Sequence, residues 1–286
     1  MISWFAGPKI AYALLLSSLH EACEFLRRLA HPMRPLAAHC NLLSEALSGI
    51  GGQNHALYDV SSYLQLASGI RNVHFSTWEF EQHPGICESA DDYRDQQDKL
   101  WGLLTQRISV FLFVWAAVEA YKAELTLVAP PKDGGTKPRQ IDKLCYYLSI
   151  QYKFPLPEKL CDVISVFRSV AAQSNIGRHA ASKTLIPGYI TPAGEGLYLV
   201  YEYRNAFAHG DFSAPFPEGD PSKHPDLAVV ALATRLVLLS LQMITLCRYP
   251  PDEPMDVPSL LRFSDEEDPL SVKETFLKLH MKSFGC

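Results

Sequence analysis

Apolar residues recur at the three- and four-residue spacing of an amphipathic helix along most of the chain. This pattern predicts an all-α fold. The expected helices span residues 8–30, 36–49, 89–125, 157–175, 192–209, 226–247 and 268–283. Residues 55–90 are not assigned to a regular element, because the segment VHFSTWEF at 73–80 fits a short strand as well as an irregular loop.

The helix expected over 192–209 has well-marked ends. Thr191 is suited to the N-cap, Pro192 to the first turn, and Gly210 to the left-handed position that follows a helix. Gly194 and Gly196 weaken the first turn, so a short extended piece at this place is an alternative.

Three regions follow from the order of these elements. We expect an N-terminal helical extension or regulatory region over 1–88, a main helical domain over 89–250, and a proline-rich linker with a C-terminal helix over 251–286. In the last region Ser271 and Glu274 have the spacing of a capping box, which predicts a helix start.

Composition and charge limit the range of possible functions. Of the 286 residues, 48% are hydrophobic and 20% are charged, which provides enough apolar material for a substantial core. The formal net charge of -5 excludes a protein that binds nucleic acid through a broadly basic surface. A local basic site is still compatible with this charge.

We expect neither a membrane-spanning segment nor a bound metal ion. The apolar run ISVFLFVWAAV at 108–118 is too short to span a bilayer. The segment HEACEF at 20–25 lacks the second His of a zinc hydrolase motif. The cysteines are scattered without CxxC spacing, as in a cytoplasmic protein with reduced thiols. They are Cys23, Cys40, Cys87, Cys145, Cys161, Cys247 and Cys286.

Candidate chemistry gathers in YRNAFAHGDF at 203–212. On a helix, Asn205 and His209 share one face, and Arg204 flanks them. The guanidinium of Arg204 is suited to bind a phosphate, and the imidazole of His209 is suited to transfer protons. These groups are sufficient for RNA cleavage through the 2′-hydroxyl. In the alternative interpretation they only satisfy backbone carbonyls at a helix end.

The R-N-x-x-x-H core of YRNAFAHGD and its trailing Gly resemble the signature of the HEPN superfamily, and of its Apea-like branch in particular. The long apolar helix that contains ISVFLFVWAAVEAYKAEL is similar to the HEPN helix that carries a buried acid. Glu119 matches this acid only by its position in the helix. The resemblance covers about residues 90–250.

The resemblance implies an all-α helical bundle that acts as a metal-independent endoribonuclease without a cofactor. It implies that Arg204 and His209 are the catalytic pair and that Asn205 is the polar residue that accompanies them. It also implies a homodimer with one RNA-binding cleft, a role in prokaryotic antiphage or toxin-like defence, and room for a regulatory partner protein. Asp211 stands where toxins paired with a nucleotidyltransferase have Tyr, so that subtype is not expected.

Some further residues have two interpretations each. Glu119 is either a supporting acid that pairs with Arg204 or Arg168, or a solvent-facing carboxylate. The segment NIGRHAASK at 175–183 is either an RNA contact or a solvated loop. Its candidate RNA-binding residues are Arg178, His179 and Lys183.

The basic segment PPKDGGTKPRQIDK at 130–143 is expected to be a mobile flap and lacks the G-K-[ST] ending of a phosphate-binding loop.

Two functions remain besides the endoribonuclease. The first keeps the HEPN-like fold but makes it a non-catalytic dimerisation or RNA-binding module. The second is a helical scaffold unrelated to RNA. Cleavage of RNA in the absence of divalent metal ions separates the nuclease from both.

Overall fold

The predicted all-α fold is confirmed. The computed structural model describes residues 32–51, 55–76, 88–131, 137–176, 184–210, 214–217, 219–255 and 270–282. In this part of the chain all extended regular elements are helices, and the only β-type pairings are two isolated bridges.

Eight α-helices and one short 3-10 helix make up the described elements. In chain order they are α2 (Leu36–Gly51), α3 (His55–Gly69), α4 (Glu88–Ala123), α5 (Gln140–Gln151), α6 (Leu160–Gln173), α8 (Pro192–Ala208), η2 (Pro221–Lys223), α9 (Pro225–Arg248) and α10 (Val272–Lys278).

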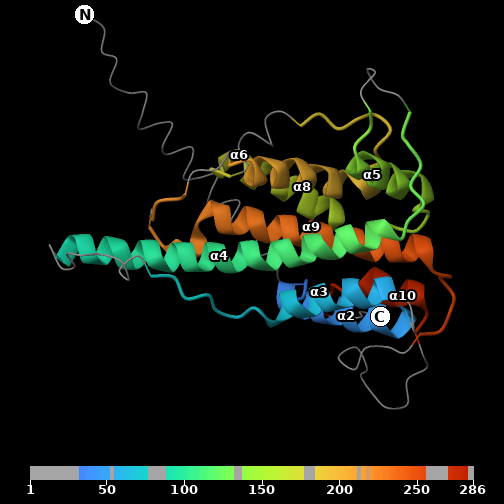
Figure 1. Ribbon diagram of the computed structural model, residues 1–286, viewed down its shortest axis with the longest axis horizontal. Helices are drawn as coiled ribbons and strands as arrows, with labels where there is room; N and C mark the ends of the chain where they lie inside the picture. Colours follow the sequence, from blue (N-terminus) through green and yellow to red (C-terminus); the bar gives the residue numbers. More distant parts are fainter. Residues whose placement is uncertain are drawn as a thin grey trace, which may run out of the picture.

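The helices form three layers around α9 (Figure 1). On one side lie α5, α6 and α8, on the other α2, α3 and α10, and α4 runs beside α9 between them. The long α4 extends beyond the other helices at its N-terminal end. The two sides of the boundary expected after residue 88 share one hydrophobic core, because α2 and α3 pack against α9 and α4 respectively.

The predicted helices agree with the observed ones to within a few residues at most ends. The helix expected over 8–30 lies outside the described residues. The predicted capping box is present, since the Ser271 hydroxyl accepts a hydrogen bond from the Glu274 backbone and the Glu274 carboxylate accepts one from Ser271. The helix that it starts ends at Lys278, earlier than expected.

Two helices were not expected. The helix α3 occupies part of the unassigned region, although its buried residues have regular helical spacing: they are Leu57, Val60, Leu64 and Ala67. The helix α5 begins inside the segment expected to be a mobile flap. Its apolar face is short, and the flanking Pro and Gly residues obscured it.

The centre of the core is α9, which is buried along nearly its whole length. Two described helices, α4 and α9, are long and apolar enough to cross a membrane by length and composition alone. For α9, 89% of the apolar window is buried inside the protein, as expected of a core helix, against 39% for α4. The outer face of α4 is therefore the more exposed apolar surface.

A chain of buried polar groups crosses this core from α2 to α10. The Arg235 guanidinium donates a hydrogen bond to Nδ1 of His39 at 2.7 Å, so the proton of that ring is on Nε2. From there His39 donates to Oε1 of Gln242 at 2.9 Å. The Gln242 amide in turn donates to the Phe276 carbonyl and lies 3.5 Å from Nδ1 of His280. Nε2 of His280 then donates to the Glu158 carbonyl at 2.9 Å.

These hydrogen bonds require both histidines to be neutral. Burial, and next the positive charge of Arg235, hold the pKa of His39 well below its ordinary value. Burial also lowers the pKa of His280 to about 4. Arg235 itself is 7% exposed, and burial lowers its pKa to about 10, so it stays charged at neutral pH. A buried cation thus helps to keep its neighbours uncharged.

The neutral state of His280 makes stability depend on pH. Its pKa is lower in the folded protein than in the unfolded chain, so the unfolded chain binds the proton more readily and stability falls as pH decreases below about 6.5. We expect this histidine to lower the free energy of unfolding by about 1.4 kcal/mol between pH 7.5 and pH 5.5. Urea denaturation at the two pH values measures it.

In the variant His280→Gln, the loss of unfolding free energy between pH 7.5 and pH 5.5 should be smaller by that amount. This holds whatever the stability of the variant at pH 7.5. The same change at His74, whose ring is exposed, is the control. An unchanged difference in His280→Gln would contradict the neutral assignment.

Candidate functional site

The start of α8 packs closely on α5 and α9. A Cβ at Gly194 would clash with the Cys145 carbonyl oxygen of α5, and one at Gly196 would lie 3.1 Å from a methyl group of Leu236 in α9. The glycines therefore allow close helix packing, which explains why they are tolerated in a helix. The alternative of an extended piece at this place is wrong, because α8 begins at Pro192.

The end of α8 is formed by backbone groups, as predicted. The last α-helical residue is Ala208, and the backbone N–H of His209 donates to the Asn205 carbonyl at 2.9 Å. Gly210 follows with a φ of 76°, the left-handed conformation that ends many helices. The His209 side chain is exposed at this end.

Tyr203 anchors the last turns of α8 in the core. Its buried ring makes edge contacts with Phe111 of α4, at 6.3 Å between centroids, and with Phe167 of α6, at 5.9 Å. Such aromatic pairs fix orientation as well as bury area. The orientation of Tyr203 determines the direction in which the next residue, Arg204, leaves the helix.

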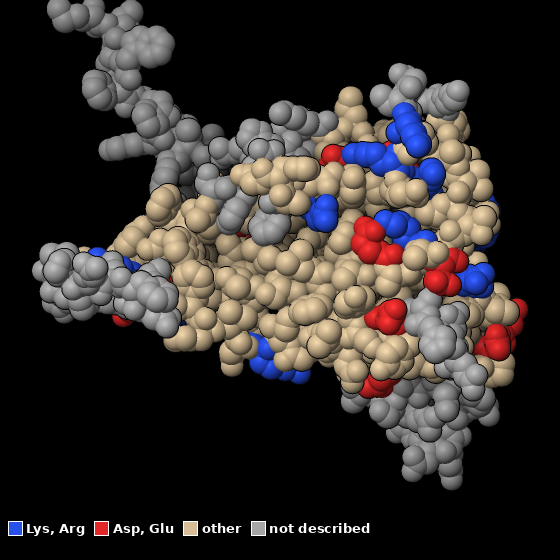
Figure 2. Space-filling model, in the orientation of Figure 1, with Lys and Arg blue, Asp and Glu red and all other residues tan. Residues whose placement is uncertain are grey.

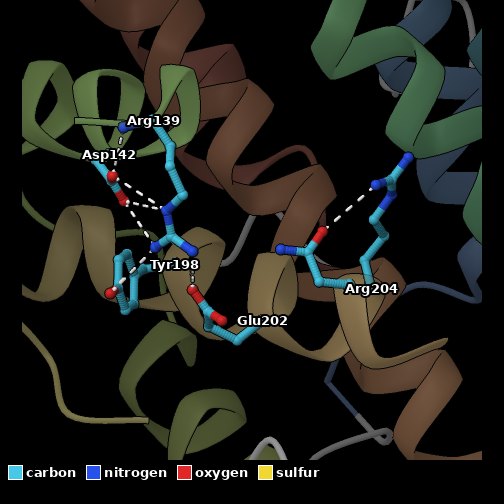
Figure 3. Close-up of polar contacts among 6 residues, drawn as sticks. Arg139, Asp142, Tyr198, Glu202 and Arg204 are labelled. Carbon is cyan, nitrogen blue, oxygen red and sulfur yellow. Dashed lines mark hydrogen bonds and ion pairs between the residues drawn. The ribbon is translucent and has the colours of Figure 1, made fainter. Parts of the chain in front are cut away.

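Arg204 points from α8 toward α4 (Figure 3). Its guanidinium lies over the indole of Trp115, with Cζ 5.9 Å from the ring centroid, and donates a long hydrogen bond of 3.4 Å to Oδ1 of Asn205. Asn205 therefore contacts the arginine. Among the described residues no carboxylate forms an ion pair with Arg204, so its charge is not neutralised there.

A second arginine beside α8 has the opposite environment. Arg139 forms ion pairs with Glu202 at 2.6 Å and with Asp142 at 2.8 Å, and it donates to the Tyr198 hydroxyl (Figure 3). Although burial acts against the charged form, these partners raise the pKa of Arg139 above its ordinary value. The prediction of a mobile flap is wrong for this residue, because the ion pairs join the start of α5 to α8.

Glu119 lies on the surface of α4, where its carboxylate pairs with Lys122 of the next turn. The other proposed partner, Arg168, forms an ion pair with Glu195 at 2.8 Å. The structure therefore agrees with the solvent-facing interpretation of Glu119. The candidates Arg178, His179 and Lys183, and also Asp211, lie outside the described residues.

The structure thus joins Arg204 to Asn205 and places His209 one turn further on. No hydrogen bond in the described part of the chain connects the imidazole of His209 to either residue, and neither Arg204 nor His209 donates a side-chain hydrogen bond to a backbone carbonyl there. The interpretation as a helix-end brace therefore has no support from these contacts. Trp115 is the residue that sequence reasoning missed, because it appeared as one more core residue in an apolar run.

Within the described residues no group of three or more His, Cys, Asp or Glu side chains is placed to hold a metal ion. The four cysteines in this part of the chain are free thiols, with Cys40 and Cys145 buried, Cys247 half-buried and Cys161 exposed.

Comparisons with known proteins find no matching family model, no similar curated protein and no similar solved structure. The assignment of a function consequently depends on the chemistry of the site and on the motif.

Proposed function

We propose that this protein is a metal-independent endoribonuclease of the HEPN type, with Arg204 and His209 as its catalytic residues. The observation that supports this most directly is the environment of Arg204. Its charge is oriented by an aromatic ring and an amide, without a carboxylate among the described residues, whereas Arg139 and Arg168, which also contact α8, are paired with acids. A half-buried arginine whose charge is not neutralised by an acid is suited to bind a phosphate.

The proposed reaction uses the RNA chain as its own nucleophile. His209 accepts the proton of a 2′-hydroxyl, the 2′-oxygen attacks the adjacent phosphorus, and the bond from phosphorus to the 5′-oxygen breaks. The 5′-oxygen takes up a proton, so the products have a 2′,3′-cyclic phosphate and a 5′-hydroxyl. Arg204 stabilises the negative charge that develops on the phosphoryl oxygens.

A homodimer is part of the proposal. Acid–base cleavage needs a proton acceptor on one side of the phosphate and a donor on the other, and a two-fold dimer brings a second His209 to the site. Leu112 is 48% exposed and lies one turn before Trp115, the residue of α4 that contacts Arg204. The surface over the middle of α4 carries few charged side chains in Figure 2, which favours contact with a second copy.

The second candidate is a non-catalytic RNA-binding or dimerisation module. The absence of a hydrogen bond between the imidazole of His209 and either Arg204 or Asn205, among the described residues, favours it. In that case Arg204 binds phosphate and no bond is cleaved. The defence role that the resemblance implies, and a regulatory partner, are compatible with both candidates.

The catalytic variants test the first candidate. We expect the wild type to cleave mixed single-stranded RNA in EDTA and to leave cyclic phosphate ends. His209→Ala and Arg204→Ala should each reduce the rate by about 10²–10⁴-fold, because each removes a group that acts on the reacting phosphate. Gel electrophoresis with end-group analysis measures both results.

The exposed pair Arg71 and His74 provides matched controls, since Arg71→Ala and His74→Ala should cleave at the wild-type rate. Circular dichroism verifies that each variant is folded. Activity that requires Mg²⁺ would contradict the mechanism, and RNA binding without cleavage would favour the second candidate.

Asn205→Asp tests whether RNA binding depends on the unneutralised charge of Arg204. The new carboxylate replaces the amide oxygen that already contacts Arg204, so it should pair with the guanidinium and repel the RNA backbone. We expect a melting temperature close to that of the wild type and a loss of RNA affinity of at least about tenfold. Fluorescence polarisation of a labelled RNA measures the affinity. Wild-type affinity in this variant would remove Arg204 and Asn205 from the binding site.

The dimer has its own test. Leu112→Lys places a charge in the proposed contact, so we expect the variant to sediment as a monomer and to lose cleavage activity. The control is Leu66→Lys on α3, which is as exposed (53%) and should remain dimeric. Analytical ultracentrifugation of the wild type at micromolar concentration comes first, and a fully active monomer would rule out the dimer.

A further inference from the structure

Two cations and two aromatic rings form a continuous row across α5, α8 and α4. Cζ of Arg139 lies 4.8 Å from the centroid of the Tyr201 ring. The rings of Tyr201 and Trp115 follow at 6.2 Å, inclined by 32°. Cζ of Arg204 lies 5.9 Å from the centroid of the Trp115 ring at the far end. Both interactions at the ends are within the range of a cation–π contact.

The two ends of the row differ in charge. Arg139 at one end is neutralised by Asp142 and Glu202. At the other end Arg204 has the ring of Trp115 and the amide of Asn205 as its contacts among the described residues. An aromatic face attracts a guanidinium but carries no net charge, so it can orient the group without neutralising it. A carboxylate in the same place would compete with a bound phosphate.

We propose that Trp115 is a positioning residue for the phosphate-binding Arg204. Only 4% of Trp115 is exposed, so the ring cannot stack with an RNA base and acts through the arginine. The rings of Phe111 and Tyr201 pack around it and hold it in place. A guanidinium fixed in this way loses less side-chain freedom when a phosphate binds, which strengthens binding. This inference depends on the proposed function for its role, but the contact itself can be measured independently.

The decisive experiment is a double-mutant cycle. Trp115→Leu and Trp115→Phe are each made in the wild-type protein and in the Arg204→Ala variant. For each protein the affinity for a fluorescein-labelled single-stranded RNA and the kcat/KM of cleavage are measured. With Arg204 present, Trp115→Leu should weaken both by about tenfold, and Trp115→Phe should retain most of the wild-type values, because phenylalanine keeps an aromatic face. In the Arg204→Ala background Trp115→Leu should have no further effect. An equal effect in both backgrounds would overturn the proposal.

Tyr121→Leu is the matched control, since Tyr121 is as buried on the same helix (1% exposed) and, in the described part of the chain, has no ring contact with Trp115, Tyr203 or Arg204. It should lower the urea midpoint of unfolding as Trp115→Leu does and leave RNA affinity unchanged. An equal loss of affinity in Tyr121→Leu would show a general packing effect and would also overturn the proposal.

Unfolding in urea separates this proposal from the nuclease itself. If the contact is real, the shifts of Trp115→Leu and Arg204→Ala are not additive in the double variant. Additive shifts overturn the proposal even if the protein cleaves RNA. If the shifts are non-additive but the protein neither binds nor cleaves RNA, the contact between Trp115 and Arg204 is confirmed. Its role in RNA binding is then refuted together with the proposed function.

Discussion

The burial of α9 is the constraint on which the rest of the structure depends. A helix surrounded on nearly every side needs an apolar face from each neighbour and an internal partner for each of its polar side chains. Gln242 and Arg235 find those partners in His39, His280 and backbone carbonyls of segments far apart in the sequence. The chain of hydrogen bonds thereby fixes how α2 and α10 sit on α9, and the core leaves α8 a defined place on the opposite side.

Three arginines of this protein have different environments, and each environment gives the positive charge a different role. Arg235 is buried and bound to neutral acceptors, so its charge acts only on its neighbours. Arg139 is surrounded by carboxylates and serves to join two helices. Arg204 lies over an aromatic ring without a carboxylate among the described residues, which leaves its charge available to a ligand. The environment, more than the residue type, distinguishes the arginine suited to binding from the two that are structural.

Much of the fold could be predicted from local signals, and the site only in part. The ends of α8 follow from Thr191–Pro192 and Gly210, because turn and cap geometry is decided within a few residues. The partners of Arg204 depend on tertiary packing, since Trp115 is distant in sequence and reads as a core residue. For Arg139 only one partner depends on tertiary packing, because Asp142 lies three residues further on whereas Glu202 is distant in sequence on α8. Sequence reasoning can name a charged residue but not what compensates its charge.

In the last turns of α8, the groups that stabilise the helix end differ from the candidate functional side chains. Tyr203 points into the core and holds the helix, while backbone hydrogen bonds and the left-handed Gly210 complete its end. Because those groups already close the helix, the side chains of Arg204 and His209 are not required to cap it. The guanidinium of Arg204 and the imidazole of His209, five residues further on, are therefore both left available for the role proposed above. The fold thus closes α8 with backbone groups and leaves the half-buried Arg204 and the exposed His209 free of a capping role.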